Sequence, residues 1–347
     1  MPQPHPSETA STARRAPTHT PLHVGVHVPP SQPPQHVIFA LTAEFTHLAF
    51  ASAVEPLRIA NLVAGRELYR WSFASENGET ATASNGSVTL VHHRFDALPP
   101  CDRLFVISGL DVQKHDHSAL IAALRREART RRTQIGAVCS GAWVLAQSGL
   151  IDGRRAAIHW DWHEGFVEEF PQVSLERGVF VADETFITAS GGSATADLML
   201  HLIERDHGYD LAVAVADQMV YTTVRTDTAA QRISLQSRKG VRNKHLADAV
   251  EVMRTTLDAP LTAAELAERT GITARQLERL FRTHLGVTPT RHYTDMRLER
   301  ARSLLLQTEM SILEVAIACG YQSAGHFTRV YRTAFGVTPR EQRARLT

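Results

Sequence analysis

The sequence predicts an α/β domain with a flavodoxin-like parallel sheet and helices on both faces, followed by an all-α domain with two helix-turn-helix motifs. Three observations lead to this prediction. Short apolar runs alternate with stretches of helical apolar spacing up to residue 221. No segment after residue 244 has the character of a strand. The same C-terminal region also repeats itself, as two copies of one helical motif would.

Residues 1–21 are predicted to be a disordered tail. They contain two arginines but no apolar stretch after them, so they do not read as a secretory signal. No apolar run in the chain approaches the roughly 20 residues that a membrane helix needs. The cysteines, Cys101, Cys139 and Cys319, are too scattered for a disulfide framework or a zinc site. We therefore expect a cytoplasmic protein without a membrane partner, a metal or a cofactor.

The α/β domain is expected over residues 22–221. The predicted strands are 36–41, 69–75, 104–108 and 135–139, with a strand pair in 179–190 that turns at Asp183 and Glu184. The predicted helices are 45–63, 116–130, 140–148, 193–207 and 209–221. Strands that alternate with helices favour a parallel sheet, because parallel neighbours need a long crossover connection.

Residues 222–243 are polar and are predicted to be the linker between the domains. From Arg238 to the end there are 18 Lys and Arg against 11 Asp and Glu, whereas the rest of the chain has 19 against 25. A basic region attached to an acidic body indicates a nucleic-acid-binding module. The excess is modest, and many solvated helical surfaces are basic, so this feature supports the prediction without carrying it.

The second domain, residues 244–347, contains an internal repeat. The sequence LERLFRTHLGVTP at 277–289 corresponds to FTRVYRTAFGVTP at 327–339, an offset of 50. Upstream, the tripeptide at 265–267 (ELA) corresponds to the tripeptide at 314–316 (EVA) at an offset of 49. The missing residue falls in a turn, where a change of length is tolerated.

Each copy of the repeat has the pattern of a helix-turn-helix. In the first copy, a helix over 262–270 precedes a turn at Gly271, and Thr273 is placed to cap the next helix with Gln276 in a capping box. In the second copy, a helix over 311–319 precedes Gly320, and Ser323 is the cap. The helix after each cap is the predicted recognition helix.

The N-terminal faces of the recognition helices are expected to contact a double-stranded DNA operator. The exposed residues there are Arg275, Glu278 and Arg279 in the first helix and Ala324, Gly325, Thr328 and Arg329 in the second. Arginine can bind guanine through two hydrogen bonds. The second helix has small residues at two of these positions, so we expect it to depend more on shape and phosphate contacts.

Helical repeats also occur in proteins that do not bind DNA, but two copies that each end in GVTP, joined by an Arg-rich helix over 290–306, are a specific pattern. Residues 244–343 resemble the C-terminal domain of the AraC/XylS regulators. The resemblance implies two recognition helices in successive major grooves on one face of the DNA.

The segment AVCSG at 137–141 follows a predicted strand and opens a predicted helix, which is the layout of a nucleophile elbow. A helix N-terminus lowers the pKa of a thiol, and His159 follows Cys139 by 20 residues. The alternative is that Cys139 is a small buried apolar residue and His159 a satisfied polar one. The strand–turn–helix context favours a ligand pocket, for which the predicted residues are Cys139, His159, Trp160, Gly109 and Ser140.

Four stretches of the α/β domain resemble the PfpI-like branch of the class I glutamine-amidotransferase superfamily and, more closely, the sensor half of GlxA-type AraC regulators. They are FASAVEPLRIAN (50–61), ASNG (83–86), GAVCSGAWVLAQSGLIDGRRAAIHW (136–160) and ITASGGSATADLMLHLIERDHG (187–208). Members of the superfamily often carry a carboxylate on the first helix beside the cysteine. Here that position is Ala49, with Glu44 and Glu55 out of register. A cysteine and histidine without this acid favour binding over turnover.

The resemblance implies a transcription regulator, and it favours an activator of a catabolic operon that has RNA polymerase as a further partner. It also implies a homodimer through the α/β domain, which would pair two DNA-reading domains on one operator. The rival function is a catalytically active Cys-dependent amidase-like or hydratase-like enzyme tethered to DNA.

Regulators similar by motif act in arginine, carnitine and glycine-betaine catabolism. The expected effector is therefore a small nitrogenous metabolite, an amino acid or a quaternary amine. Trp143, Trp160 and Trp162 lie close in sequence to the predicted pocket, and aromatic faces hold quaternary ammonium groups. The alternative for one or two of these tryptophans is packing in the core or in the dimer interface.

Overall fold

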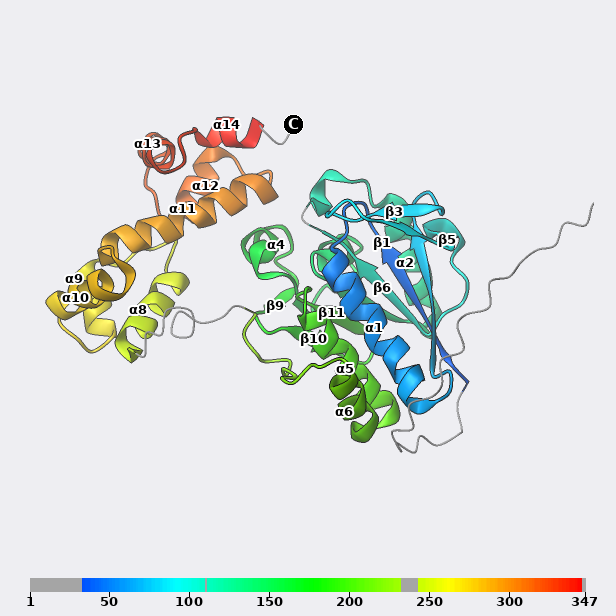
Figure 1. The fold of residues 1–347 in the computed structure, drawn as a ribbon. Coiled ribbons are helices and arrows are strands. Elements are labelled where there is room, and N and C mark those ends of the chain that lie inside the picture. Colours follow the sequence, from blue (N-terminus) through cyan, green and yellow to red (C-terminus); the bar gives the residue numbers. More distant parts are fainter. Residues whose placement is uncertain (1–32, 110, 232–242, 345–347) are drawn as a thin grey trace, which may run out of the picture.

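The computed structural model describes residues 33–109, 111–231 and 243–344, which form an α/β domain and a helical domain (Figure 1). The predicted tail at 1–21 lies outside the described residues, as do residues 232–242 of the predicted linker. Within the described residues, no helix is long and apolar enough to cross a membrane.

A seven-stranded sheet forms the centre of the α/β domain. Its strands, in spatial order, are β10 (Phe180–Ala182), β11 (Phe186–Ala189), β7 (Gln134–Val138), β6 (Arg103–Ile107), β1 (Gln35–Leu41), β2 (Tyr69–Ser75) and β5 (His93–Arg94). All neighbours pair in parallel except β10 and β11. The predicted parallel sheet is confirmed. So is the predicted strand pair that turns at Asp183 and Glu184, since β10 and β11 are antiparallel neighbours on either side of this turn.

Helices cover both faces of this sheet, as predicted (Figure 1). One face packs against α1 (His47–Ala64), α5 (Ala194–His207) and α6 (Tyr209–Gln218). The other face packs against α2 (Ser118–Thr130) and α3 (Gly141–Gln147). Each face has its own apolar core, so both faces of the central strands are buried, as parallel strands require.

Several short elements were not predicted. They are edge strand β5, the antiparallel hairpin of β3 (Thr80–Thr82) and β4 (Val88–Leu90), the parallel pair β8 (Arg155–Ala157) and β9 (Ser174–Glu176), the 3-10 helices η1 (Phe95–Ala97), η2 (Val112–Lys114) and η3 (Trp160–Trp162), and helix α4 (His163–Glu169). None of these elements exceeds seven residues. Segments of this length carry too few periods of an apolar pattern to be recognised.

The described part of the C-terminal domain is helical throughout. Its helices are α8 (Lys244–Thr255), α9 (Ala263–Arg269), α10 (Ala274–Leu285), α11 (Pro289–Gln307), α12 (Ile312–Ala318), α13 (Ala324–Phe335) and α14 (Pro339–Ala344). They form two separate apolar cores, one around Phe281 and the other around Phe327. Helix α11 contributes Tyr293 to the first core and Leu304 to the second, so it joins the two helix-turn-helix units.

The repeated GVTP sequence encodes a junction between helices. Gly286 ends α10 in the left-handed conformation with φ of 74°, which costs glycine little. Thr288 then caps α11 by accepting a hydrogen bond from the backbone N–H of Arg291, and Pro289 is the first residue of that helix. The second copy repeats this arrangement at Gly336–Pro339.

The predicted helix caps are confirmed. Thr273 and Gln276 form a capping box at the start of α10, and Ser323 caps α13. The turns before these caps have Gly271 and Gly320 with φ of 70° and 71°. Both recognition helices therefore begin where the sequence pattern places them.

Candidate DNA-binding surface and ligand pocket

The recognition helix α10 exposes Arg275, Glu278 and Arg279. Glu278 pairs with Arg282 one turn further on, with 3.0 Å between the charged atoms. Arg275 and Arg279 form no ion pair within the described residues. Two unpaired guanidinium groups on one exposed face can bind base edges or phosphates without first breaking an internal contact.

The recognition helix α13 presents smaller side chains than α10 at the positions expected to face DNA. Gly325 and Arg329 are exposed, whereas Ala324 and Thr328 are half-buried. Gly325, Thr328 and Arg329 line a shallow depression together with Arg332, Thr333 and Thr338. An open groove flanked by two arginines suits contact with a DNA backbone more than direct reading of bases.

Cys139 lies on the predicted strand–turn–helix elbow between β7 and α3. Its φ angle is 62°, a left-handed conformation that non-glycine residues seldom adopt. The backbone N–H of Cys139 donates to the carbonyl of Ala189, and Gly191 packs against its side chain. A Cβ atom on Gly191 would lie 2.6 Å from that of Cys139, so only glycine allows this approach.

Burial dominates the chemistry of the Cys139 thiol. The residue is 5% exposed, and burial raises the pKa of the thiol, partly offset by the Thr46 hydroxyl 3.5 Å from Sγ and by the backbone N–H of Ser140. The expectation that the helix N-terminus lowers this pKa is therefore wrong, because desolvation of the thiolate outweighs the hydrogen bonds. The thiol is neutral at pH 7.

His159 is also held in its neutral form. Burial lowers the pKa of its imidazole, and the charge of Asp161 acts in the opposite direction. Nδ1 accepts a hydrogen bond from the backbone N–H of Asp161 at 3.3 Å, and the backbone N–H of His159 donates to the carbonyl of Cys139. Within the described part of the chain, no hydrogen bond joins the imidazole to the Cys139 thiol. The two side chains do not form a thiolate–imidazolium pair.

Two residues that act on the Cys139 thiol, Thr46 and Asp161, are not among the pocket residues predicted from the sequence. Thr46 precedes α1, and Asp161 is the carboxylate whose charge acts on both Cys139 and His159. Position 49 carries an alanine, which lies in the core, and Asp161 is the one carboxylate whose charge acts on Cys139 among the described residues. The position of Asp161, two residues after His159, was the available signal for it.

The three tryptophans have different environments. Trp143 and Trp162 are buried and pack edge to face with ring centres 5.3 Å apart. Trp160 is 38% exposed, and its ring centre lies 5.3 Å from that of His159. The alternative of core packing therefore holds for two of the three, and Trp160 is the one beside the candidate pocket.

Ser140 and Gly109 are buried next to the elbow. The Ser140 hydroxyl donates to the carbonyl of Gly109, which ties the end of β6 to the start of α3. A Cβ atom on Gly109 would lie 1.8 Å from the carbonyl oxygen of Glu44, so this position requires glycine. These two residues hold the loops around Cys139 together.

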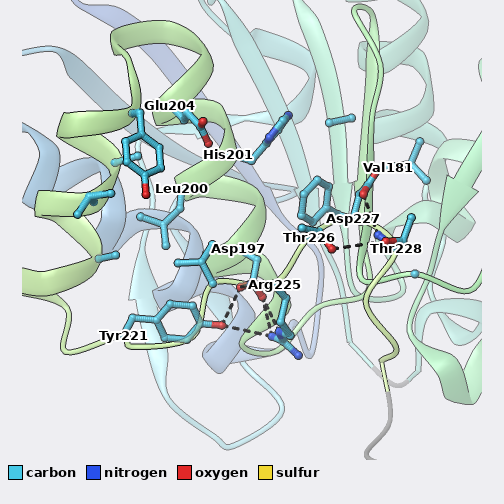
Figure 2. A pocket seen from close by; sticks show the side chains of 18 of the residues that line it. Val181, Asp197, Leu200, His201, Glu204, Tyr221, Arg225, Thr226, Asp227 and Thr228 are labelled. Atoms are coloured by element: carbon cyan, nitrogen blue, oxygen red, sulfur yellow. Dashed lines mark hydrogen bonds and ion pairs between the residues drawn. The ribbon is translucent and has the colours of Figure 1, made fainter.

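A cavity of about 580 Å³ lies elsewhere, between α5, α6, β10 and residues 221–228 (Figure 2). None of the five predicted pocket residues lines it. Buried Asp197 forms an ion pair with Arg225 at 2.7 Å and accepts a hydrogen bond from Tyr221. Asp197 thereby holds Tyr221 and Arg225 against α5. The candidate ligand site that the sequence predicts, around Cys139, lies outside this cavity.

The fold and the paired recognition helices define a DNA-binding transcription regulator. Residues 35–205 match the DJ-1/PfpI family, and residues 266–345 match a helix-turn-helix domain. The chain belongs to the family of HTH-type transcriptional regulators that combine a DJ-1/PfpI domain with an AraC-type helix-turn-helix domain.

Similar proteins share this two-domain organisation. The chain is 41% identical to the HTH-type transcriptional regulator GbdR of Pseudomonas aeruginosa, over 91% of this chain and 86% of that protein. It is 36% identical to the HTH-type transcriptional regulator GlxA of Rhizobium meliloti, over 90% of this chain and 96% of that protein. A crystal structure of an AraC family transcriptional regulator from Pseudomonas putida matches 54% of this chain and all of its own, with 26% identity and a TM-score of 0.50.

Proposed function

We propose that this regulator activates a catabolic operon when a small nitrogenous metabolite, an amino acid or a quaternary amine, binds beside Cys139, His159 and Trp160. The observation that carries the proposal is the strained Cys139 elbow with a neutral thiol, in a chain whose other domain reads DNA. Backbone strain of this kind costs about 1–3 kcal/mol and is concentrated at functional sites.

The surroundings of the elbow favour a cationic ligand. Trp160 offers a partly exposed aromatic face, and Asp161 supplies negative charge from the next residue. A cation over an indole ring gains roughly 0.5–2 kcal/mol. Together these groups match a quaternary or primary ammonium group better than an anion.

The rival function is a Cys-dependent enzyme tethered to DNA. A working thiol nucleophile needs a base within hydrogen-bond reach and a lowered pKa. Cys139 has neither, since its described hydrogen-bond partner is Thr46 and its pKa is raised. These properties support binding over turnover.

The test compares wild type with Cys139→Ala, Cys139→Ser and the control Cys101→Ala, a half-buried thiol outside the candidate site. A panel of amino acids and methylated amines is screened by thermal shift, since a ligand bound to the folded state raises the melting temperature. At least one Cys139 variant should still bind the panel ligand and drive transcription, with altered affinity. Steady-state turnover of an amide, aldehyde or isonitrile, lost in both variants together with the transcriptional response, would overturn the proposal in favour of the enzyme.

We also propose that the regulator is a homodimer through its α/β domain. Leu48, Val88 and Leu90 are 59%, 61% and 76% exposed. Helix α1 and strand β4 begin side by side, because the Ser87 hydroxyl lies 2.9 Å from Nδ1 of His47. Apolar side chains gathered in this way support a contact with a second copy. RNA polymerase is the further partner that an activator requires.

A further inference from the structure

The two domains contact each other where α11 packs on η3 and α4 (Figure 1). Nε of Arg300 lies 3.1 Å from a carboxylate oxygen of Glu164, and Nη2 lies 3.9 Å from one of Glu168. The Arg300 side chain is only 19% exposed. Arg300 Nε forms no hydrogen bond within the described residues, so the guanidinium group attracts this face of the α/β domain to the long helix through its charge between two carboxylates.

Gln307, the last residue of α11, is held by both segments that flank the candidate pocket. Its side-chain amide N–H donates to the backbone carbonyl of Asp161 at 2.8 Å, and its backbone carbonyl accepts from the side-chain amide of Gln113. Asp161 follows His159 by two residues, and Gln113 follows Gly109 by four. A displacement of Asp161 or Gln113 would break a hydrogen bond to the last residue of α11.

Helix α11 in turn sets where the two helix-turn-helix units meet. Arg297, one turn before Arg300, donates to the carbonyls of Cys319 and Gly320, both at 2.7 Å. Gly320 packs on the first unit, since a Cβ atom there would lie 2.6 Å from Pro260 Cδ and 2.9 Å from the Leu257 carbonyl. Arg297 therefore holds the second unit to α11, one turn away from Arg300, which contacts the α/β domain.

The docked α/β domain leaves the DNA-reading side chains accessible. Arg275, Arg279 and Arg329 are all exposed in the arrangement described. Docking therefore does not act by covering the recognition helices. What it constrains is α11, the helix that joins the two units and so determines their spacing.

We propose that the contact of α11 with η3 and α4 couples the loops of the candidate pocket to DNA affinity. The docked α/β domain holds α11 through Arg300 and Gln307, and this keeps the two recognition helices at the spacing that DNA requires. The identity of the ligand that acts on the loops rests on the proposed function. The coupling between docking and DNA binding does not.

The first experiment uses the full chain and a DNA site that the wild type selects from a random pool. Arg300→Glu places a carboxylate between Glu164 and Glu168, so affinity should fall on the order of tenfold. Adding Glu164→Arg restores an ion pair of reversed sense and should recover most of the loss. The control Glu169→Arg changes an exposed residue of the same helix and should leave affinity at the wild-type value.

Hydrogen exchange in the same variants reports the contact itself. Amides in 160–169 and 300–308 should exchange faster in Arg300→Glu and return towards wild-type rates in the double variant. Wild-type DNA affinity in Arg300→Glu would overturn the proposal. Failure of the double variant to recover a measured loss would also overturn it, because the loss would then reflect damage to α11 alone.

The second experiment perturbs the contact from the pocket side. Gln113→Ala removes the donor to the Gln307 carbonyl, and DNA affinity should fall about threefold, the scale of one hydrogen bond. Lys114→Ala alters the neighbouring exposed residue and is the matched control. Equal affinities of both variants would overturn the pocket-to-helix coupling. Neither experiment contains a ligand, so a negative thermal-shift screen would count against the proposed effector site and leave this coupling standing.

Discussion

Gly271 and Gly320 occupy equivalent positions in the two helix-turn-helix units and have nearly the same φ angle. Their surroundings differ. A Cβ atom on Gly271 would meet nothing within 4 Å, whereas one on Gly320 would lie 2.8 Å from the Asp258 carbonyl and 2.9 Å from that of Leu257. The left-handed conformation is the requirement common to both glycines, and close packing is added at Gly320.

We expect Gly271→Ala to lower the free energy of unfolding by about 1 kcal/mol, the cost of the left-handed conformation for alanine. Gly320→Ala should lower it by about 2–4 kcal/mol, because the methyl group must also displace backbone atoms. Urea unfolding of the full chain, followed by a probe of the C-terminal domain, measures both values. Equal losses would show that the contact between the units is loose.

His163 makes stability depend on pH. Burial lowers the pKa of its imidazole from about 6.5 to about 4, helped by the charge of Arg177. Between these values the unfolded chain takes up a proton that the folded chain does not, so stability falls as pH drops through this window. The full loss, reached below about pH 4, is on the order of 3 kcal/mol.

His163→Gln removes this titrating group. Wild type should lose about 2 kcal/mol more than the variant between pH 7.5 and pH 5, when unfolding is measured for both at each pH. The comparison subtracts the other histidines, since they are common to both proteins. A variant with the same pH dependence as wild type would rule out His163 as the source.

At the scale of elements, α10 and α13 are copies of one motif with different surfaces. Arg279→Ala on α10 should cost about 1–3 kcal/mol for the selected site and relax base preference at one position. Arg329→Ala on α13 should weaken binding about equally for all sequences and reduce the salt dependence, because its groove suits phosphate contact. Binding titrations against the selected site and random DNA at several salt concentrations separate the two effects.

The controls for this pair lie within the same helices. Arg282→Ala removes an arginine that is paired with Glu278, so it should change affinity less than Arg279→Ala. If wild type bound the selected site and random DNA equally well, the assignment of α10 as a base-reading helix would fail.

At the scale of the whole molecule, the proposed homodimer predicts a mass near twice the chain mass of 38.4 kDa by light scattering. Leu90→Asp puts a charge on the exposed apolar patch of α1 and β4 and should shift the protein towards monomer. Val220→Asp, at a residue that is 84% exposed elsewhere on the same domain, should not. A wild-type mass of one chain, with and without DNA, would contradict the dimer.

The sequence by itself determined the fold class, the two recognition helices and the elbow at Cys139. Each depends on signals that are local in the chain. Apolar runs a few residues long mark the strands, capping residues such as Thr273 mark helix starts, and GVTP marks the junction after each recognition helix. Because the motif occurs twice, the helix-turn-helix fold of the C-terminal domain could be predicted from the sequence pattern.

Only the tertiary structure decided the chemistry of Cys139 and the contact between the domains. The thiol is neutral because burial, which depends on every element packed around it, outweighs the local effect of the helix N-terminus. Likewise, Gln307 meets Asp161 across 146 residues of sequence, and Arg300 meets Glu164 across 136. Contacts at this separation leave no periodic trace in either segment, because they follow from how the two folded domains fit together.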